Sequence, residues 1–95
     1  MTYKLKFEKR AWKEWEKLGH PVKEQFKKKL EERLQNPRVP SAKLSGHADR
    51  YKIKLRSAGY RLVYQVFDDE VVVSVIAIGK RENADVYNLD RKSVV

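Results

Sequence analysis

The sequence has no cysteine and no long apolar run. Without cysteine, the chain can form neither disulfide bonds nor thiolate metal sites. Its longest apolar stretch, residues 71–79, is far shorter than the ~18 residues that a membrane-spanning helix needs. The N-terminus alternates lysine with apolar residues, so it lacks the apolar core of a secretory signal. These absences predict a cytoplasmic protein with no membrane association.

Conventional catalytic groups are also scarce. The two histidines, His20 and His47, do not have the spacing of metal ligands, and no glycine-rich phosphate-binding loop is present. The acidic triplet at 68–70 is interpreted as a hairpin turn, because three adjacent carboxylates in an extended chain point in different directions. The sequence therefore predicts no metal and no cofactor. If the chain is an enzyme, lysine, arginine and tyrosine must carry its chemistry.

What the sequence has in excess is positive charge. It contains 22 Lys and Arg against 13 Asp and Glu, a net charge of +9 over 95 residues. The net charge is +7 in residues 1–50 and +2 in residues 51–95. A chain this short forms a single domain, residues 1–95, with one core. A strongly basic small domain most often binds a polyanion, usually nucleic acid, because neutralising phosphates releases condensed counterions.

The hydrophobic pattern of the first half predicts a strand followed by two helices. Residues 2–7 alternate apolar and charged side chains, which is typical of a strand covered on one face. Apolar residues then follow helical spacing over 8–18 and stop at Gly19, where a left-handed glycine cap is expected. Pro21 suits the first turn of a second helix, which continues as one apolar stripe until Pro37. So short a link makes the two helices antiparallel.

The second half is predicted to be a meander of three strands that follows a loop over 37–50. Turns at 57–59 and 68–70 separate the strands. The last strand, over 71–78, is apolar on both faces and is expected at the centre of the sheet. A short helix is expected over 83–94. The predicted class is α+β, in the order β-α-α-β-β-β with a short C-terminal helix, and its mainly antiparallel four-stranded sheet packs on two antiparallel helices.

The alternation of apolar residues in the first two strands of the meander predicts their register. Directly opposed residues share a face, so burying both apolar sets requires Leu55 opposite Tyr60 and Ile53 opposite Leu62. The same register gathers cations on the face away from the core. Like charges placed directly opposite each other destabilise a sheet, so this cluster is predicted to bind an anion. Its members are Lys52, Lys54 and Arg61, with Arg56 at the hairpin end.

The run of lysines at 27–29, on the second helix, has two interpretations. It could contact nucleic acid. Alternatively it is a solvated face, because Glu24, Glu31 and Glu32 stand four residues from these lysines and can form ion pairs with them. The pattern favours the solvated face.

RNA offers a reaction that lysine, arginine and tyrosine can catalyse without a metal. Its 2′-hydroxyl attacks the adjacent phosphorus and leaves a 2′,3′-cyclic phosphate and a 5′-hydroxyl. The site must hold the phosphate, neutralise the charge that develops on it and assist proton transfer. Crowded cations favour neutral lysine and ionised tyrosine, which lowers the pKa of both groups. Arginine stays charged and clamps phosphate.

Parts of the chain resemble the RelE toxin family of bacterial toxin–antitoxin pairs. The similar segments are 51–66, 79–82, 15–18 and 27–30, and the similarity extends from Tyr3 to about Lys92. It implies a ribosome-dependent endoribonuclease that cleaves mRNA in the ribosomal A site and is silenced by an antitoxin. The implied partners are a RelB-like acidic antitoxin, the 70S ribosome with its rRNA, and mRNA.

The resemblance also implies which residues form the site. The catalytic set of the family falls on Lys52, Lys54, Arg61, Arg81 and Tyr87. Lys52, Lys54 and Tyr87 are then candidates for proton removal and site organisation, Arg61 for stabilising the transition-state charge, and Arg81 for the side of the leaving oxygen. The candidates for binding RNA or the ribosome are Lys28, Lys43, Arg56 and Lys80.

This sequence departs from the family pattern at Ser45, where family members often carry a basic residue that helps hold the mRNA bases. Codon preference or affinity is therefore left open. Two other functions remain as alternatives. ParE-like gyrase poisons share the fold and act by binding protein, but their pattern lacks the Lys/Arg/Tyr set found here. A non-catalytic RNA- or ribosome-binding module is supported by charge alone.

Overall fold

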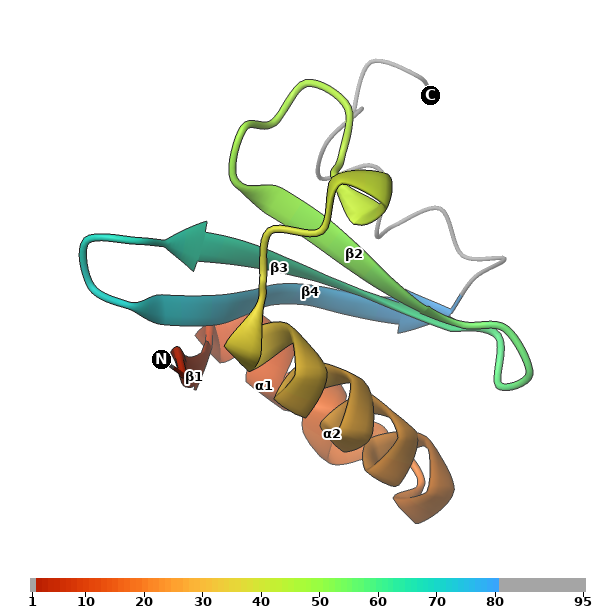
Figure 1. Cartoon of the computed structure of the whole chain (residues 1–95). Coiled ribbons are helices and arrows are strands. Elements are labelled where there is room, and N and C mark those ends of the chain that lie inside the picture. The colour runs from red at the N-terminus through yellow and green to blue at the C-terminus, as the bar shows by residue number, and fades with distance from the viewer. Residues whose placement is uncertain (1, 81–95) are drawn as a thin grey trace.

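The structure, a computed structural model, describes residues 2–80 (Figure 1). Its elements are β1 (Lys4–Phe7), α1 (Lys9–Lys17), α2 (His20–Gln35), the short 3-10 helix η1 (Pro40–Ala42), β2 (Arg50–Leu55), β3 (Tyr60–Phe67) and β4 (Val72–Lys80). This order confirms the predicted α+β arrangement. None of the helices in residues 2–80 is long and apolar enough to cross a membrane. The helix predicted over 83–94 and the candidates Arg81 and Tyr87 lie outside the described residues.

The four strands form one sheet in the order β1-β4-β3-β2. β4 therefore lies between two neighbours, as its apolar residues on both faces predicted. It pairs antiparallel with β3 and parallel with β1, so the sheet is mixed but mainly antiparallel. The register of β2 and β3 is the predicted one, with Leu55 opposite Tyr60 and Ile53 opposite Leu62.

The main core lies between the two helices and one face of the sheet (Figure 1). Ala11 and Trp15 are the buried residues of α1, and Phe26 and Leu30 are those of α2. Fully burying a large apolar side chain contributes about 1.5–3 kcal/mol. The helices are therefore held on one face, and the opposite face of the sheet is left for other contacts. The side chains that the sheet contributes to this core are Tyr51, Ile53, Leu55, Leu62, Tyr64, Val66, Val73, Val75 and Ile78.

β4 carries one extra residue relative to β3. Val63 pairs with Ala77 and Tyr64 pairs with Val75, so Ile76 is the additional residue of a bulge. The bulge shifts the alternation of β4 by one position. Ile76 and Ala77 consequently join Val63 and Leu44 in a second, smaller apolar cluster, separate from the main core.

The link between the helices differs from the prediction. Gly19 is not a left-handed cap: its φ is −68°, and it is the N-cap of α2, which begins at His20, one residue before Pro21. Leu18 is likewise extended, with φ −70°. The reason is the shortness of the link, because the chain must enter α2 at once, and the Lys23 N–H already bonds the Gly19 carbonyl at 3.0 Å.

Left-handed glycines occur instead in the loops, at Gly46 (φ 83°) and at Gly59 (φ 71°) in the turn between β2 and β3. The segment 37–50 was predicted to be a loop without regular structure. It contains η1 and an antiparallel bridge between Lys43 and Tyr51, so it is tied to the outer edge of β2.

Candidate active site

Three of the predicted catalytic residues lie together on the face of the sheet that points away from the helices. β2 contributes Lys52 and Lys54, and β3 contributes Arg61 directly opposite Lys54. Lys54 is exposed, whereas Lys52 and Arg61 are half-buried. The register that places them was predicted from the apolar alternation alone. Two hydrogen-bonded strands therefore bring the three cations into one small area.

The backbone places Lys54 and Arg61 especially close to each other. The carbonyl of Lys52 points to the free edge of β2, where it accepts a hydrogen bond from Arg33 Nη1 at 3.2 Å. Because backbone groups alternate along a strand, those of Lys54 point the same way. Lys54 and Arg61 are therefore a non-hydrogen-bonded pair, in which facing side chains approach more closely than in the other kind.

The surroundings of this pair suit a bound phosphate. Arg61 lies opposite Gly79 of β4, which has no side chain to cover the sheet at that position. Lys52 lies opposite Val63, a member of the second apolar cluster. An apolar surface beside the cations lowers the local dielectric and strengthens their attraction for a phosphate.

The same face carries a further cation, Arg50, which the sequence interpretation missed. Arg50 lies opposite Gln65, and its Nε donates a hydrogen bond to Gln65 Oε1 at 3.2 Å. The period-two alternation of Lys52 and Lys54, extended one step toward the N-terminus, is the signal that could have found it. Along β2 and β3, none of the residues on this face is acidic.

The four predicted RNA- or ribosome-binding residues are spread over the molecule. Arg56 is exposed in the turn that follows β2, and Lys43 is exposed on the segment bridged to the edge of β2. Lys80 lies opposite Tyr60, on the helix-facing side of the sheet. Lys28 is exposed on α2. The structure thus places Arg56 and Lys43 next to β2, and Lys80 and Lys28 away from the cationic face.

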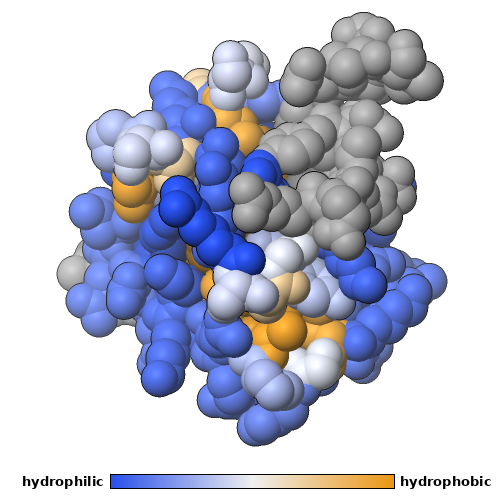
Figure 2. Space-filling model, turned by 90° about the vertical axis from the view of Figure 1, so that its right-hand side faces the viewer, coloured by the Kyte–Doolittle hydropathy of each residue, from blue (hydrophilic) through white to orange (hydrophobic). Residues whose placement is uncertain are grey.

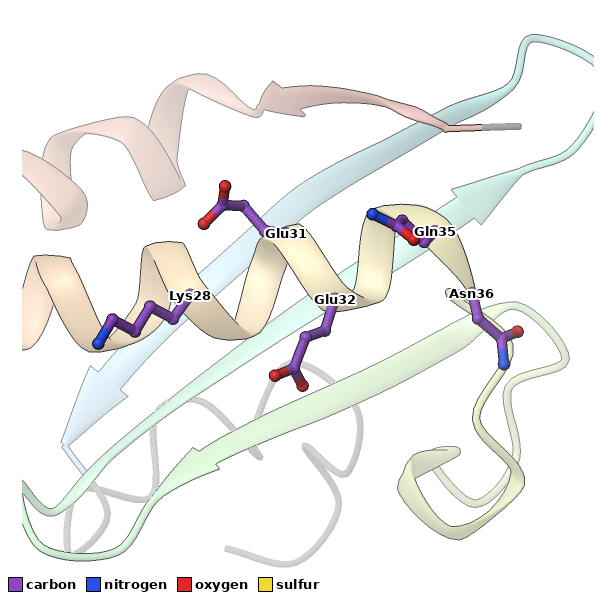
Figure 3. A pocket seen from close by; sticks show the side chains of 5 residues that line it. All are labelled: Lys28, Glu31, Glu32, Gln35 and Asn36. Atoms are coloured by element: carbon purple, nitrogen blue, oxygen red, sulfur yellow. The ribbon is translucent and has the colours of Figure 1, made fainter.

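The outer surface of α2 has mixed charge. A depression of about 580 Å³ is lined by Lys28, Glu31, Glu32, Gln35 and Asn36 (Figure 3). Glu31 and Glu32 point away from one another in this view. Lys27 forms an ion pair with Glu24 at 3.4 Å, three residues apart and not at the predicted spacing of four. The mixed charge agrees with a solvated face.

The view onto the end of the molecule where β2 turns into β3 is mostly hydrophilic (Figure 2). Apolar side chains form small, separate patches among the charged ones. Among the described residues, the large apolar side chains that are exposed are Leu5 (37%) and Trp12 (45%), on β1 and α1. The described part of this face is therefore suited mainly to polar and charged ligands.

Arg38 joins three parts of the chain, and no sequence pattern pointed to it. Its Nη2 lies 2.9 Å from Asp49 Oδ1 and 2.7 Å from Asp68 Oδ2, and its Nη1 donates to the Tyr51 hydroxyl at 3.2 Å. Tyr3 donates its hydroxyl to Asp68 Oδ1 at 2.7 Å. The hydrogen bonds from Arg38 and then Tyr3 hold the pKa of Asp68 below its usual value. The cluster fastens the segment before β2 to the β3–β4 turn.

Tyr64 connects the end of α2 to the sheet beneath the cationic face. Its fully buried hydroxyl donates to the Pro37 carbonyl at 2.7 Å and accepts a hydrogen bond from Arg33 Nη1 at 2.9 Å. Its ring stacks on that of Tyr51, with centroids 5.7 Å apart. Burial raises the pKa of Tyr64, and the hydrogen bond from Arg33 opposes this rise. Arg33 Nη1 also donates to the Lys52 carbonyl, so these contacts hold the Lys52 backbone from the helix-facing side of the sheet.

A family model described as the ParE toxin of type II toxin–antitoxin systems matches residues 5–84. The chain belongs to this toxin family. Within it, the chain is similar to proteins named RelE. It is 61% identical over 88 residues to the mRNA interferase toxin RelE of Escherichia coli K12, covering 93% of each chain. It is 55% identical over 89 residues to a putative RelE-like toxin protein of E. coli, covering 94% of each.

Solved structures agree with this assignment. The isolated E. coli RelE toxin superimposes with a TM-score of 0.82 at 57% identity, covering 98% of this chain and 99% of that one. The toxin in the intact E. coli RelBE toxin–antitoxin complex superimposes with a TM-score of 0.81 at 62% identity, covering 85% of this chain and 99% of that one. The predicted resemblance to RelE toxins is therefore confirmed.

Proposed function

We propose that this toxin is a ribosome-dependent endoribonuclease that cleaves mRNA in the A site and so inhibits translation. The observation that carries the proposal is the grouping of Lys52, Lys54 and Arg61 on one face without an acidic neighbour on β2 or β3. Such a cluster attracts a phosphodiester. Repulsion among its cations lowers the stability of the fold, and a cluster kept despite this cost favours a functional role. The relatives named mRNA interferase supply the reaction class.

In the proposed reaction, the 2′-hydroxyl of the RNA attacks the adjacent phosphorus, and the bond from phosphorus to the 5′-oxygen of the next nucleotide breaks. Arg61 stabilises the charge of the transition state. Lys52 and Lys54 organise the site and assist removal of the 2′ proton, with Tyr87 as a further candidate. By the family resemblance, Arg81 is proposed to act on the leaving oxygen. The roles of Arg81 and Tyr87 rest on the family resemblance.

The proposed products are a 2′,3′-cyclic phosphate and a 5′-hydroxyl, and the reaction needs no metal. Because the nucleophile belongs to the RNA, no metal-bound water has to be generated. Because the cationic side chains neutralise the phosphate, no metal is needed to do so. The described part of the chain places no histidine or carboxylate on the cationic face of β2 and β3 to act as a strong base. Alignment must therefore supply much of the rate, an effect worth about 7–11 kcal/mol in well-oriented systems.

The ribosome is proposed to supply that alignment by holding the mRNA codon against the cationic face. Arg56 and Lys43 are placed to extend the contact with RNA, whereas Lys28 and Lys80 would contact a different part of the ribosome. Because ribosomes are its proposed target, the cytoplasm is the proposed place of action. By analogy with the RelBE complex, an acidic RelB-like antitoxin is the proposed inhibitor.

The proposal is tested by mixing purified protein with ribosomes that carry a defined codon in the A site. We expect cleavage of the bound mRNA and little cleavage of the same RNA free in solution. A 2′-deoxy substitution at the cut nucleotide should block the reaction. Products with 5′-phosphate ends would instead indicate a water nucleophile, and equal cleavage of free RNA would contradict dependence on the ribosome.

A second candidate function is poisoning of DNA gyrase. The observation in its favour is the matching family model, which is described as a ParE toxin. A gyrase-dependent DNA cleavage assay separates the two functions. We expect no DNA breaks at concentrations that cleave ribosome-bound mRNA.

A further inference from the structure

The face that carries the predicted catalytic cations has a second polar row. Arg50 lies opposite Gln65, Gln65 lies opposite Ser74 of β4, and Ser74 is paired with Lys6 of β1. Facing residues in a sheet share a face, so this row crosses all four strands on the side away from the helices. The row formed by Arg50, Gln65, Ser74 and Lys6 is called the distal row below.

The distal row is parallel to the row of Lys54 and Arg61, and between the two lies a row that is cationic on β2 and apolar on β3 and β4. Along β2, Arg50 stands four residues before Lys54, about 13 Å at the rise of a strand. Between the two rows, Lys52 faces Val63, and Val63 faces Ala77. The face therefore presents a line of cations along β2, beside an apolar strip on β3 and β4.

The backbone and side chain of Arg50 are both fixed. Its carbonyl accepts a hydrogen bond from the Leu44 N–H at 2.9 Å, and its Nε donates to Gln65 Oε1 at 3.2 Å. A hydrogen bond to a neutral amide orients a guanidinium without removing its charge. Gln65 is neutral, so this hydrogen bond does not itself neutralise the charge of Arg50.

We propose that Arg50 is an mRNA-binding residue, which holds a backbone phosphate of the same mRNA strand at a distance from the bond that is cleaved. This inference rests on the proposed function, because it requires mRNA to lie across the cationic face. Single-stranded RNA is commonly held by cations that follow its backbone, with apolar or aromatic surface under the bases. The line of cations along β2, with the apolar strip beside it, fits such a strand. The oriented guanidinium of Arg50 suits a phosphate oxygen.

The test compares Arg50→Ala with wild-type protein in single-turnover cleavage on programmed ribosomes at several salt concentrations. We expect the half-saturating protein concentration to rise at least about threefold, and the slope of log affinity against log salt to fall in magnitude by about 0.7 to 1. The rate at saturation should stay within about twofold of wild type. Arg50→Lys should keep the salt slope. Gln65→Glu should reduce the slope as Arg50→Ala does, because it pairs the guanidinium with a carboxylate.

Arg10→Ala is the matched control, since Arg10 is exposed on α1 and carries the same charge. Its salt slope should change less than that of Arg50→Ala. Ribosomes whose mRNA ends at the P-site codon present rRNA but no mRNA in the A site, so they show which of the two RNAs Arg50 contacts. On them, Arg50→Ala and wild type should bind equally. An equal defect on both kinds of ribosome would assign Arg50 to rRNA and overturn the inference.

The outcomes also separate this inference from the proposed function. If the wild-type protein cleaves no ribosome-bound mRNA, the proposed function is wrong. If it cleaves and Arg50→Ala has the wild-type slope and half-saturation, only the role of Arg50 is wrong. If Arg50→Ala lowers the rate and thermal stability without changing the slope, its bond to Gln65 has a structural role only, which also contradicts the inference.

Discussion

Lys54 and Arg61 face each other directly across β2 and β3, on the side of the sheet away from the core. Like charges in this position destabilise a strand pair, whereas opposite charges contribute about 0.2–1 kcal/mol. A sheet selected for stability alone would carry opposite charges here. The pair therefore opposes folding at the place where we propose that phosphate binds.

The first prediction concerns this trade between stability and activity. Lys54→Glu should raise the free energy of unfolding by about 0.2–1 kcal/mol, because it replaces a repulsive cross-strand pair by an attractive one. The same substitution should abolish cleavage of ribosome-bound mRNA. Urea denaturation measures the first effect and single-turnover kinetics the second. In an Arg61→Gln background the gain in stability should disappear, and a gain of equal size there would mean that the two side chains do not interact.

The β2–β3 hairpin shows how far local pattern determines this fold. Alternation of apolar residues was enough to predict its register and the clustering of Lys52, Lys54 and Arg61, because a shift by one residue would expose one whole apolar set. The central place of β4 followed from its apolar residues on both faces. Its parallel pairing with β1 did not follow, because that contact joins segments almost 70 residues apart, from Lys4 to Val72.

Other features lay outside the reach of pattern for physical reasons. Gly19 was expected to be left-handed, yet a glycine residue is compatible with both signs of φ, and only the geometry of the link decides between them. Arginine is usually a surface residue, so the sequence gives no sign of the structural roles of Arg33 and Arg38. Their roles come from partners that tertiary folding brings close, such as Tyr64 and Asp68. Arg50 was missed although its alternation with Lys52 was visible.

The second prediction uses the two kinds of glycine. Gly19→Ser should stabilise the protein by about 0.5 kcal/mol, because serine is a preferred N-cap and Gly19 has φ −68° with no side-chain cap on α2. A Cβ at Gly19 would meet nothing closer than Pro21 Cδ at 3.8 Å. Gly59→Ser should instead destabilise by about 1–2 kcal/mol, because Gly59 has φ 71°. Equal effects of the two changes on the denaturation midpoint would contradict the difference in backbone conformation between Gly19 and Gly59.

The third prediction concerns pH. Hydrogen bonds from Arg38 and Tyr3 lower the pKa of Asp68 in the folded state. The contribution of Asp68 is therefore complete above its unfolded pKa of about 3.9 and is lost as the pH falls through the lower folded value. Asp68→Asn should be less stable than wild type at pH 7, and the difference should shrink toward pH 3. Urea midpoints between pH 3 and pH 7 measure this.

Asp69→Asn is the control for the pH experiment, because Asp69 is exposed in the same turn. Its stability at pH 7 should differ little from that of wild type, because the bonds of Asp68 to Arg38 and Tyr3 stay in place. At the alkaline end the hydrogen bond to Asp68 raises the pKa of Tyr3. The contribution of Tyr3 is then present below its unfolded pKa of about 10 and is lost as the pH rises through the higher folded value.

The fourth prediction separates the cationic face from the helix surface. Arg61→Ala should slow the chemical step at saturation by about 100-fold or more, because it removes a group that stabilises transition-state charge. Lys28→Ala should change only the salt-dependent affinity for the ribosome. Single-turnover rates at saturating protein distinguish the two. If Lys28→Ala slowed the chemical step as much as Arg61→Ala, the division between site and solvated helix would be wrong.

The last prediction concerns the anchor beneath the site. Tyr64→Phe keeps the buried ring but removes the hydroxyl that bonds the Pro37 carbonyl and accepts from Arg33. Because Pro37 is buried, its carbonyl then loses a partner that water does not readily replace, and stability should fall by about 1–3 kcal/mol. Tyr51→Phe is the matched control. Its hydroxyl bonds Arg38, which keeps both aspartate partners, so it should lose less than about 1 kcal/mol.

Both tyrosine variants keep the aromatic stack and the positions of the cations, so their effect on cleavage is informative. Arg33 bonds Tyr64 on one side and the Lys52 carbonyl on the other. Tyr64→Phe should therefore leave Arg33 less well held and slow cleavage at saturation more than Tyr51→Phe does. In a Lys52→Ala background this difference in rate should vanish, because the effect reaches the chemistry through Lys52. A difference that persists there would mean that Tyr64 acts on the site through general stability and not through the strand that carries Lys52.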